Sequence, residues 1–413
     1  MDFSRVAVRA TRPPSRLRIY ASVVGQVLCP TLVMAYLLSL GPRLFPAEGV
    51  APMDFQCFWA ASKVALTEGP TAVYDLDAMR AAQVALHGRA DAPTGCMFIY
   101  PPVALLLFLP LALLPYTVSA VAWLASTAAA YALALRALLP GWAAVMPFLA
   151  FPAAFLNAWY GQSGFLSAAL LGTAAVQMAK RPVLAGVCLG CLVYKPQLGL
   201  ILPLGLAAAG RWRAFVAASA TVLGFAGAAT AAFGFEIWPA FLTSVERALR
   251  WMEATPGRIA FDMASVFTAT KLLSGGHPGW AYAAQATAAA GACALMVPAL
   301  RRGLGGRAEV AVMAAVIPLA TPYFFQYDQV ILTVPLAWML AEARRTGFLP
   351  WERAAFVALM VSPAVAYAAA RAWDVPLAPL VSACVFAAVL RRVRHMVAAR
   401  AADPPLRSRE ALA

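Results

Sequence analysis

Residues 49–59 read Gly-Val-Ala-Pro-Met-Asp54-Phe-Gln-Cys-Phe-Trp59, and this stretch lies between long apolar runs. Apolar runs of this kind indicate a membrane protein, so the polar stretch has to emerge at the membrane surface. It continues to Tyr100-Pro101-Pro102, where apolar sequence resumes. Ionisable groups near the membrane are costly and are functional candidates. We therefore expect Asp54 to act on a polar group of a lipid-borne molecule.

The overall composition supports a membrane protein. Of 413 residues, 62% are hydrophobic and only 12% are charged, and the mean hydropathy is +0.74. A soluble domain is about 25% charged. The net charge of +14 does not indicate nucleic-acid binding, because the basic residues form short clusters between apolar runs, as in cytoplasmic loops. We expect an all-α, polytopic membrane protein with a single transmembrane domain and no nucleic-acid partner.

The basic clusters also predict the orientation of the chain. Residues 1–18 carry five arginines before the first apolar run, which indicates a cytoplasmic N-terminus and a retained first helix. We expect about 10–12 transmembrane helices within residues 19–395, both termini in the cytoplasm, and a mobile tail at 396–413, in the cell membrane. The predicted spans are 19–40, 116–135, 142–158, 164–179, a broken pair within 182–209, 214–233, 280–300, 310–320, 330–341, 354–370 and 377–390.

This orientation leaves two large extracytoplasmic loops, residues 41–100 and 234–279. Residues 54–66 have aromatic side chains at helical spacing, which predicts a short helix in the interface with these aromatic side chains toward lipid. Residues 237–252 have one apolar and one charged face, which predicts a second interfacial helix. Residues 103–114 are too short to span and predict a partial or re-entrant helix.

The cysteines and histidines do not indicate a metal site. Cys188 and Cys191 have a C-x-x-C spacing, but they lie in an apolar run without a second pair of cysteines. This favours a role as small residues of the core. The three histidines, at 87, 277 and 395, are too scattered for a ligand set. Cys57 and Cys96 share the first large loop, where an oxidising compartment would permit a disulfide. We expect neither a metal nor a cofactor.

Five polar interruptions fall on the external side of this topology. They are Asp54, Tyr100-Pro101-Pro102, Tyr160-Gly161-Gln162, Lys195-Pro196-Gln197 and Tyr327-Asp328. Each has an alternative structural explanation. Asp54 could cap its helix, Lys195 could extend its ammonium group to the interface, and Asp328 could be a solvated turn residue.

The order and spacing of these motifs resemble glycosyltransferase family 87 of the GT-C superfamily, over roughly residues 50–345. The resemblance rests on Asp54-Phe55 followed by Phe58-Trp59-Ala60, Val73-Tyr74-Asp75, Tyr100-Pro101-Pro102, Gly161-Gln162, Ala185-Gly186 to Lys195-Pro196, and Pro322-Tyr323 to Tyr327-Asp328. It implies a GT-C-like bundle and metal-independent transfer of mannose or a similar sugar from a polyprenyl-phosphate donor to a lipid or glycan acceptor. The mannosyltransferases of the family carry a histidine in the late turn, where this chain has Gln326-Tyr327-Asp328.

The resemblance implies a role for Asp54, and the chemistry of such a transfer indicates roles for other residues. Asp54 corresponds to the general base that takes the proton of the acceptor hydroxyl. The leaving lipid phosphate needs a cation, and Lys195 is the best-placed candidate. The other expected donor-site residues are Gln162, Gln197, Tyr100, Tyr327 and Asp328, and the acceptor-side candidates are Asp75 and Asp262.

Two other classes of protein share part of this pattern. A transporter or flippase of lipid-linked sugar would also contain an intramembrane lysine and broken helices. However, the sequence has no internal repeat, and both large loops fall on one side. A structural scaffold would explain neither Asp54 nor Lys195. We therefore favour a membrane glycosyltransferase with an extracytoplasmic active site.

Overall fold

The computed structural model describes residues 28–44, 54–88, 96–254 and 262–402. The basic segment 1–18, the first residues of the span predicted at 19–40, and the tail from residue 403 lie outside the described residues. Parts of both large loops also lie outside them.

The described chain is all-α, as predicted, and the only β pairing within it is one antiparallel bridge between Met263 and Phe325. The first helices, with 3₁₀ helices written η, are α2 (Cys29–Leu44), α3 (Phe55–Thr67), η2 (Pro70–Tyr74), α4 (Leu76–His87), α5 (Pro102–Phe108), η3 (Leu109–Leu113), α6 (Tyr116–Leu138), α7 (Trp142–Leu149), α8 (Pro152–Tyr160) and α9 (Gly164–Gln177). They are followed by α10 (Pro182–Gly190), η4 (Cys191–Tyr194), α11 (Pro196–Gly199), α12 (Leu202–Ala208), α13 (Trp212–Phe233), α14 (Ile237–Ala254), α15 (Val266–Leu273), α16 (Pro278–Leu300), α17 (Gly306–Ala320), η6 (Gln326–Leu332), α18 (Thr333–Thr346), α19 (Glu352–Trp373) and α20 (Ala378–Ala402).

Four of the described helices, α6, α13, α16 and α19, are long and apolar enough to cross a membrane on their own. The span predicted at 142–158 is not one straight helix, because α7 and α8 meet at an angle of 63°. Pro152 occupies the first position of α8, where its missing N–H costs little and a new helix can begin. Other predicted crossings correspond to short apolar helices such as α9. Among the described residues, four helices, or five if α7 and α8 count as one bent span, are therefore long and apolar enough for a full crossing, compared with the 10–12 crossings expected from the apolar runs.

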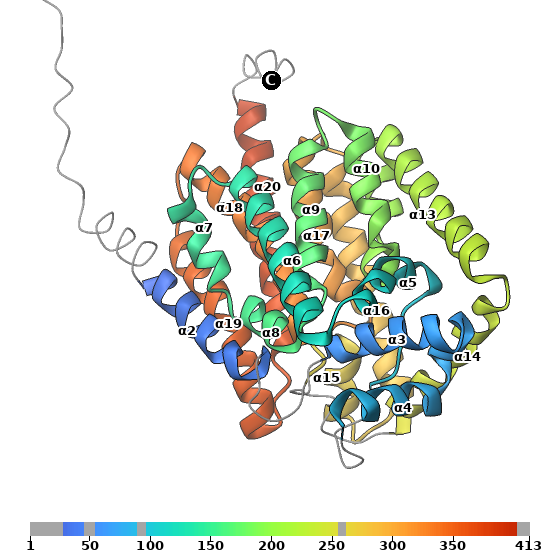
Figure 1. Cartoon of the computed structure of the whole chain (residues 1–413). Helices are drawn as coiled ribbons and strands as arrows, with labels where there is room; N and C mark the ends of the chain where they lie inside the picture. Colours follow the sequence, from blue (N-terminus) through green and yellow to red (C-terminus); the bar gives the residue numbers. More distant parts are fainter. Residues whose placement is uncertain (1–27, 45–53, 89–95, 255–261, 403–413) are drawn as a thin grey trace, which may run out of the picture.

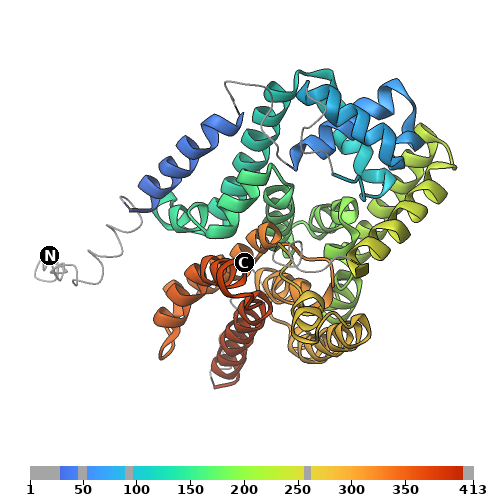
Figure 2. The same ribbon diagram turned by 90° about the horizontal axis from the view of Figure 1, so that it is seen from below.

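The helices form one bundle with two different ends (Figure 1). At one end, Arg211 at the start of α13 forms a bidentate ion pair with Glu309 of α17, with N···O distances of 2.7 and 3.0 Å. There too, Arg400 of α20 donates to the carbonyl of Gly303 (3.1 Å). The opposite end carries α3, α4, α14 and α15, and Figure 2 views the bundle from that end. The bundle therefore separates these basic residues from Asp54, which precedes α3.

The helix predicted at 54–66 is present as α3, but two of its aromatic residues do not face lipid. Phe55 and Phe58 are fully buried. The ring of Phe55 packs on Tyr116, with centroids 5.6 Å apart, and Phe58 stacks on Phe108 at 4.1 Å. The predicted lipid-facing orientation is wrong for these two rings, because α5, η3 and α6 cover them, whereas Trp59 is half-buried and Leu66 is exposed. The position of α3 in the membrane interface stays a prediction.

Helix α14 has the amphipathic pattern predicted for the second loop. Ile237 of the apolar face is buried and Glu246 of the charged face is exposed, but Leu242 of the apolar face is exposed as well. Arg247 of this helix donates to the carbonyl of Tyr74 (3.3 Å). This contact connects the two large loops, and the position of α14 in the membrane interface stays a prediction.

The segment predicted within 182–209 is broken at Lys195, as expected. Its first part, α10, packs against α13 with the two backbones in close contact. A Cβ on Gly190 would lie 2.6 Å from the carbonyl oxygen of Ala218, and a Cβ on Gly186 would also meet the backbone of α13. Small residues four positions apart allow such close packing between membrane helices.

Candidate active site

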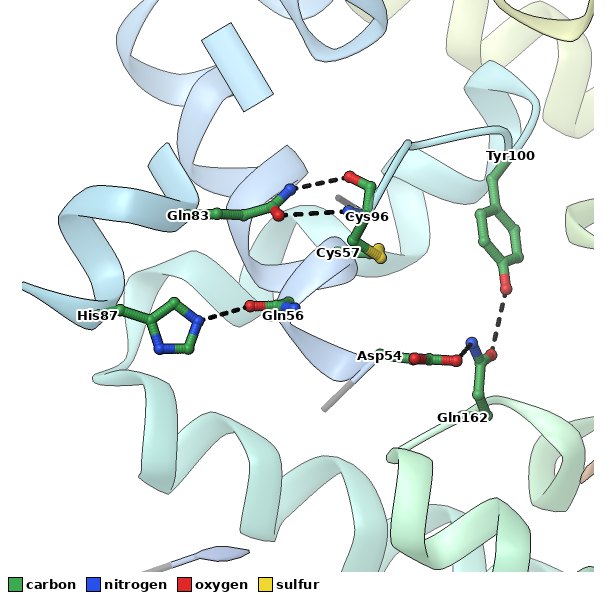
Figure 3. Close-up of a disulfide and its surroundings, with 8 residues drawn as sticks. All are labelled: Asp54, Gln56, Cys57, Gln83, His87, Cys96, Tyr100 and Gln162. Carbon is green, nitrogen blue, oxygen red and sulfur yellow. Dashed lines mark hydrogen bonds between the residues drawn. A yellow bond between two sulfur atoms is a disulfide. The ribbon is translucent and has the colours of Figure 1, made fainter. Parts of the chain in front are cut away.

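Asp54 precedes α3, but its side chain does not cap the helix. Its backbone is helical (φ −62°, ψ −20°), and the carboxylate makes no capping hydrogen bond. Instead, Oδ2 accepts a hydrogen bond from Nε2 of Gln162 at 3.0 Å (Figure 3). The capping interpretation of Asp54 is therefore wrong, and the carboxylate points toward the turn between α8 and α9.

The backbone of this turn fixes the position of Gln162. Gly161 ends α8 with φ +68°, a left-handed conformation that glycine adopts without steric cost. The N–H of Gln162 donates to the carbonyl of Asn157 (2.9 Å). Oδ1 of Asn157 in turn accepts from the N–H of Gly164 (2.6 Å) and so satisfies a donor at the start of α9. The Gly-Gln motif thus aims the Gln162 amide at Asp54.

Gln162 connects Asp54 to Tyr100. The Tyr100 hydroxyl donates to Oε1 of Gln162 (3.2 Å), so the amide nitrogen and oxygen have different partners and one orientation of the amide is favoured. The hydroxyl of Tyr74 donates to the carbonyl of Tyr100 (2.9 Å), which joins two of the sequence motifs. Burial, together with the carboxylates of Asp328 and Asp54, raises the pKa of Tyr100 well above its ordinary value. Its hydroxyl therefore stays protonated and can donate.

Lys195 forms a buried ion pair with Asp328. The Nζ–Oδ1 distance is 2.7 Å, and the two side chains are 3% and 0% exposed. The Tyr327 and Tyr100 ring centroids lie 5.1 and 5.9 Å from Nζ, within the range of cation–π attraction. Two structural alternatives are therefore wrong: Lys195 does not extend to the interface, and Asp328 is not a solvated turn residue.

The hydroxyl of Tyr100 is thus connected to the Asp54 carboxylate through Gln162. The ammonium group of Lys195 lies beside the Tyr100 ring. Asp54 can accept a proton, and Lys195 can stabilise a developing negative charge. These are the two functions that a group-transfer reaction needs at its attacking and leaving atoms.

The remaining predicted residues do not join this network directly. Gln197 is half-buried two positions after Lys195, and within the described part of the chain it has no hydrogen bond to the network. Asp75 caps α4, because its Oδ1 accepts from the N–H groups of Asp77 (2.8 Å) and Ala78 (2.9 Å). Asp262 lies beside the late turn, with its carboxylate 3.7 Å from Arg371.

A disulfide lies next to the start of α3. Cys57 is bonded to Cys96, with their Cα atoms 5.6 Å apart, so the disulfide that the sequence left open is present. Gln83 of α4 makes two hydrogen bonds to the backbone of Cys96. Its Nε2 donates to the Cys96 carbonyl (2.8 Å), and its Oε1 accepts from the Cys96 N–H (3.3 Å). Nε2 of His87 lies 2.8 Å from Oε1 of Gln56 (Figure 3). These contacts fix the first helix of the site to the segment that leads to Tyr100.

Sequence reasoning missed two sets of residues. Nε and Nη2 of Arg371 donate to the hydroxyl of Tyr367 (3.2 and 3.0 Å), and the i,i+4 spacing of this pair near the end of an apolar run could have indicated it. Next to Gln162 in the chain, the carbonyl of Ser163 accepts a hydrogen bond from the hydroxyl of Tyr194 (3.0 Å). The Tyr194 hydroxyl also shares a hydrogen bond with Ser167 (2.6 Å). No sequence motif indicated that second network.

Among the described residues, no group of three or more His, Cys, Asp or Glu side chains is placed to hold a metal ion. Cys188 is a buried free thiol, in line with the core role predicted for it, whereas Cys191 is a free thiol that is only half-buried.

Comparison with known proteins gives one match. The model of glycosyltransferase family 87 matches residues 98–322, which is more than half of the chain. The matched region includes Tyr100, Gln162 and Lys195, whereas Asp54 precedes it and Asp328 follows it. No curated protein and no solved structure matches the chain. By the extent of this match, the chain belongs to glycosyltransferase family 87.

Proposed function

We propose that this glycosyltransferase moves mannose or a similar sugar from a polyprenyl-phosphate donor to a lipid or glycan acceptor. Membership of the family supports glycosyl transfer in general. The observation that carries the finer proposal is the placement of Asp54 and Lys195 around Tyr100, connected through Gln162.

In this proposal Asp54 is the general base. The acceptor oxygen attacks the anomeric carbon of the donor sugar, and its proton passes to the Asp54 carboxylate. Gln162 holds Oδ2 of Asp54 by a neutral amide donor at 3.0 Å. This contact orients the carboxylate, and the amide that makes it carries no charge of its own.

Lys195 serves the leaving group. As the bond between the anomeric carbon and the phosphate oxygen breaks, its electron pair stays on the phosphate, whose negative charge grows. An ammonium group has three N–H donors, and the contact with Asp328 at 2.7 Å accounts for one of them. Asp328 therefore positions Nζ while other N–H groups of Lys195 bind the phosphate.

We also propose that the site faces away from the cytoplasm, with both termini on the cytoplasmic side of the cell membrane. The disulfide between Cys57 and Cys96 supports this, because such bonds persist in oxidising compartments. The basic residues Arg211 and Arg400 at the opposite end of the bundle support it as well, because cytoplasmic loops are enriched in lysine and arginine.

The test is sugar transfer by Asp54→Asn, with labelled synthetic polyprenyl-phosphate mannose as donor and a membrane lipid extract as acceptor. Asparagine keeps an oxygen for Gln162 but cannot take a proton. We expect transfer to fall by about 10²–10⁴-fold while donor binding stays unchanged. Asp75→Asn is the matched control, because asparagine is also a good helix cap. Near-normal transfer by a folded Asp54→Asn variant would contradict the role of Asp54.

A further inference from the structure

A second polar cluster, Asp262 with Arg371, lies beside Tyr327. The Oδ1–Nη2 distance is 3.7 Å, and the two side chains are 35% and 45% exposed. The two side chains are therefore partly exposed, although Oδ1 of Asp262 is itself buried and has no hydrogen-bond partner among the described residues.

Backbone pairing between two loops places Asp262 there. Residues 262–264 run antiparallel to residues 324–326, with a bridge at the centre. The N–H of Gln326 donates to the carbonyl of Asp262 (2.8 Å). Asp262 is thereby fixed to the same turn that carries Tyr327 and Asp328.

Arg371 lies on α19, and a residue of the same helix orients its side chain. Two of its nitrogens donate to the hydroxyl of Tyr367, one helical turn earlier, at 3.0 and 3.2 Å. This contact orients the planar guanidinium group. The pair offers donors and acceptors side by side, which suits neighbouring hydroxyl groups, since each hydroxyl can both donate and accept. Because the two charges compensate each other, the pair favours a neutral ligand over an anion.

Aromatic rings adjoin this polar pair. Phe325 stacks on Tyr327 with ring centroids 5.2 Å apart and planes 3° apart. Tyr160 lies 5.9 Å from Tyr327 by the same measure. Phe325 and Tyr160 are both partly exposed. Aromatic faces next to a few oriented polar groups are typical of ligand sites, and they suit the C–H faces of a sugar ring.

Tyr327 connects the second cluster with the proposed catalytic groups. Its ring lies 5.1 Å from Nζ of Lys195. Burial raises its pKa well above the ordinary value, and the charges of Asp328, Asp54 and Asp262 contribute to the increase, with Tyr100. Asp54 and Asp262 therefore both lie within electrostatic range of the same tyrosine.

We propose that Asp262 and Arg371 form the acceptor subsite and that the bound group is a neutral sugar. Neighbouring hydroxyls of this sugar contact the pair, its ring packs on the exposed aromatic faces, and a further hydroxyl reaches Asp54. The inference rests on the proposed function for the role of Asp54, but binding of the sugar does not depend on transfer.

The experiment measures binding without turnover. Purified protein in lipid nanodiscs is titrated with methyl α-mannoside, methyl α-glucoside and methyl α-galactoside, and saturation-transfer NMR detects contact with the ring protons. Mannose 6-phosphate is the anionic comparison. We expect at least one neutral glycoside to bind the wild type, and to bind Asp262→Asn and Arg371→Ala roughly tenfold more weakly, as for a lost charge-assisted hydrogen bond.

The matched control is Arg353→Ala. Arg353 lies at the other end of the same helix, over the ring of Phe348 at 4.7 Å, so its loss should leave sugar binding unchanged. Thermal unfolding checks that each variant is folded, and Asp262→Asn is the decisive one because it changes no volume.

Three results would overturn the proposal: equal binding by the wild type and Asp262→Asn, no binding of any neutral glycoside, or tighter binding of mannose 6-phosphate than of every neutral glycoside. Normal glycoside binding that depends on Asp262, in a protein that transfers no sugar, would instead uphold the subsite and contradict the proposed function.

Discussion

Lys195 and Asp328 depend on each other, so a single substitution at either position changes two properties at once. Lys195→Met leaves a buried, unpaired carboxylate, and breaking such a pair costs about 3–5 kcal/mol. We expect the double variant Lys195→Met/Asp328→Asn to recover most of this loss in thermal unfolding. Its affinity for the polyprenyl-phosphate donor should stay roughly 10- to 100-fold below wild type, because the charged contact to the phosphate is missing.

Donor affinity separates the two functions of the pair. If the double variant binds donor as tightly as the wild type, Lys195 has a structural function only. Asp328→Asn alone is the reference for the contribution of the carboxylate.

The sequence made Asp54 and Lys195 candidates because ionisable residues between apolar runs are rare. It did not identify Asp328 as the partner of Lys195, since the two are 133 residues apart and no periodicity relates them. The sequence allowed Asp54 to be a helix cap, but its side chain does not cap α3. Asp75 is a helix cap, at the start of α4. A capping residue needs a non-helical backbone, and the local sequence does not reveal that Asp54 has a helical one.

At the level of elements, the disulfide between Cys57 and Cys96 connects α3 to the segment before Tyr100. The two cysteines are 39 residues apart, and closing a loop of this length stabilises a protein by up to about 4 kcal/mol through the unfolded chain. We expect Cys57→Ser/Cys96→Ser to lower the unfolding temperature and the transfer rate, because both connected segments carry residues of the site.

Cys188→Ser is the control, because Cys188 is a free thiol. Reductant should destabilise the wild type and the control but leave the double serine variant unaffected. If reductant has no effect on the wild type, the disulfide does not contribute to its stability.

The contact between α10 and α13 is a second test at this scale. Gly190→Ala places a Cβ 2.6 Å from the carbonyl oxygen of Ala218, so the two helices have to separate. We expect a loss of about 1–3 kcal/mol, typical of overpacking, and weaker donor binding because α10 leads to Lys195. Gly199→Ala is the control, since a Cβ at Gly199 meets nothing within 4 Å. Equal unfolding temperatures for both variants would show that the close packing is not required.

Periodicity predicted α3 but not its surroundings. Phe55 and Phe58 share a face, and helical spacing shows no more than that; whether lipid or protein lies against the face depends on α5, η3 and α6, which come later in the chain. The break between α7 and α8 is signalled by Pro152, but a single proline within an apolar run is also compatible with a kinked span.

At the scale of the whole molecule, the proposed orientation can be tested by thiol labelling. Glu68 and Arg345 are both exposed in the structure, so burial does not bias the comparison. In a background without free cysteines, Glu68→Cys should react with a membrane-impermeant maleimide added to intact cells. Arg345→Cys should react only after the cells are lysed. The reverse pattern would place Asp54 on the cytoplasmic side and contradict the proposed site of transfer.

Composition predicted the class of this protein but not the arrangement of its helices. Residues 310–320 of α17 are all buried, whereas in α13 the buried residues are only Ala214 and Ala229. Both helices read as apolar runs, because lipid and a protein core favour the same side chains. Hydropathy therefore cannot distinguish a central helix from a peripheral one, nor a full crossing from a shorter apolar helix such as α9.

The wide separation of Lys195 and Asp328 along the chain also sets a condition on biosynthesis. The ribosome makes Lys195 long before its partner, which follows 133 residues later. During this interval the ammonium group lacks the carboxylate that compensates it, and an isolated charge is costly in apolar surroundings. The turn between η4 and α11 must therefore remain in contact with water or with the insertion machinery until η6 has been synthesised. Asp328 is thus the residue whose arrival allows this turn to become buried.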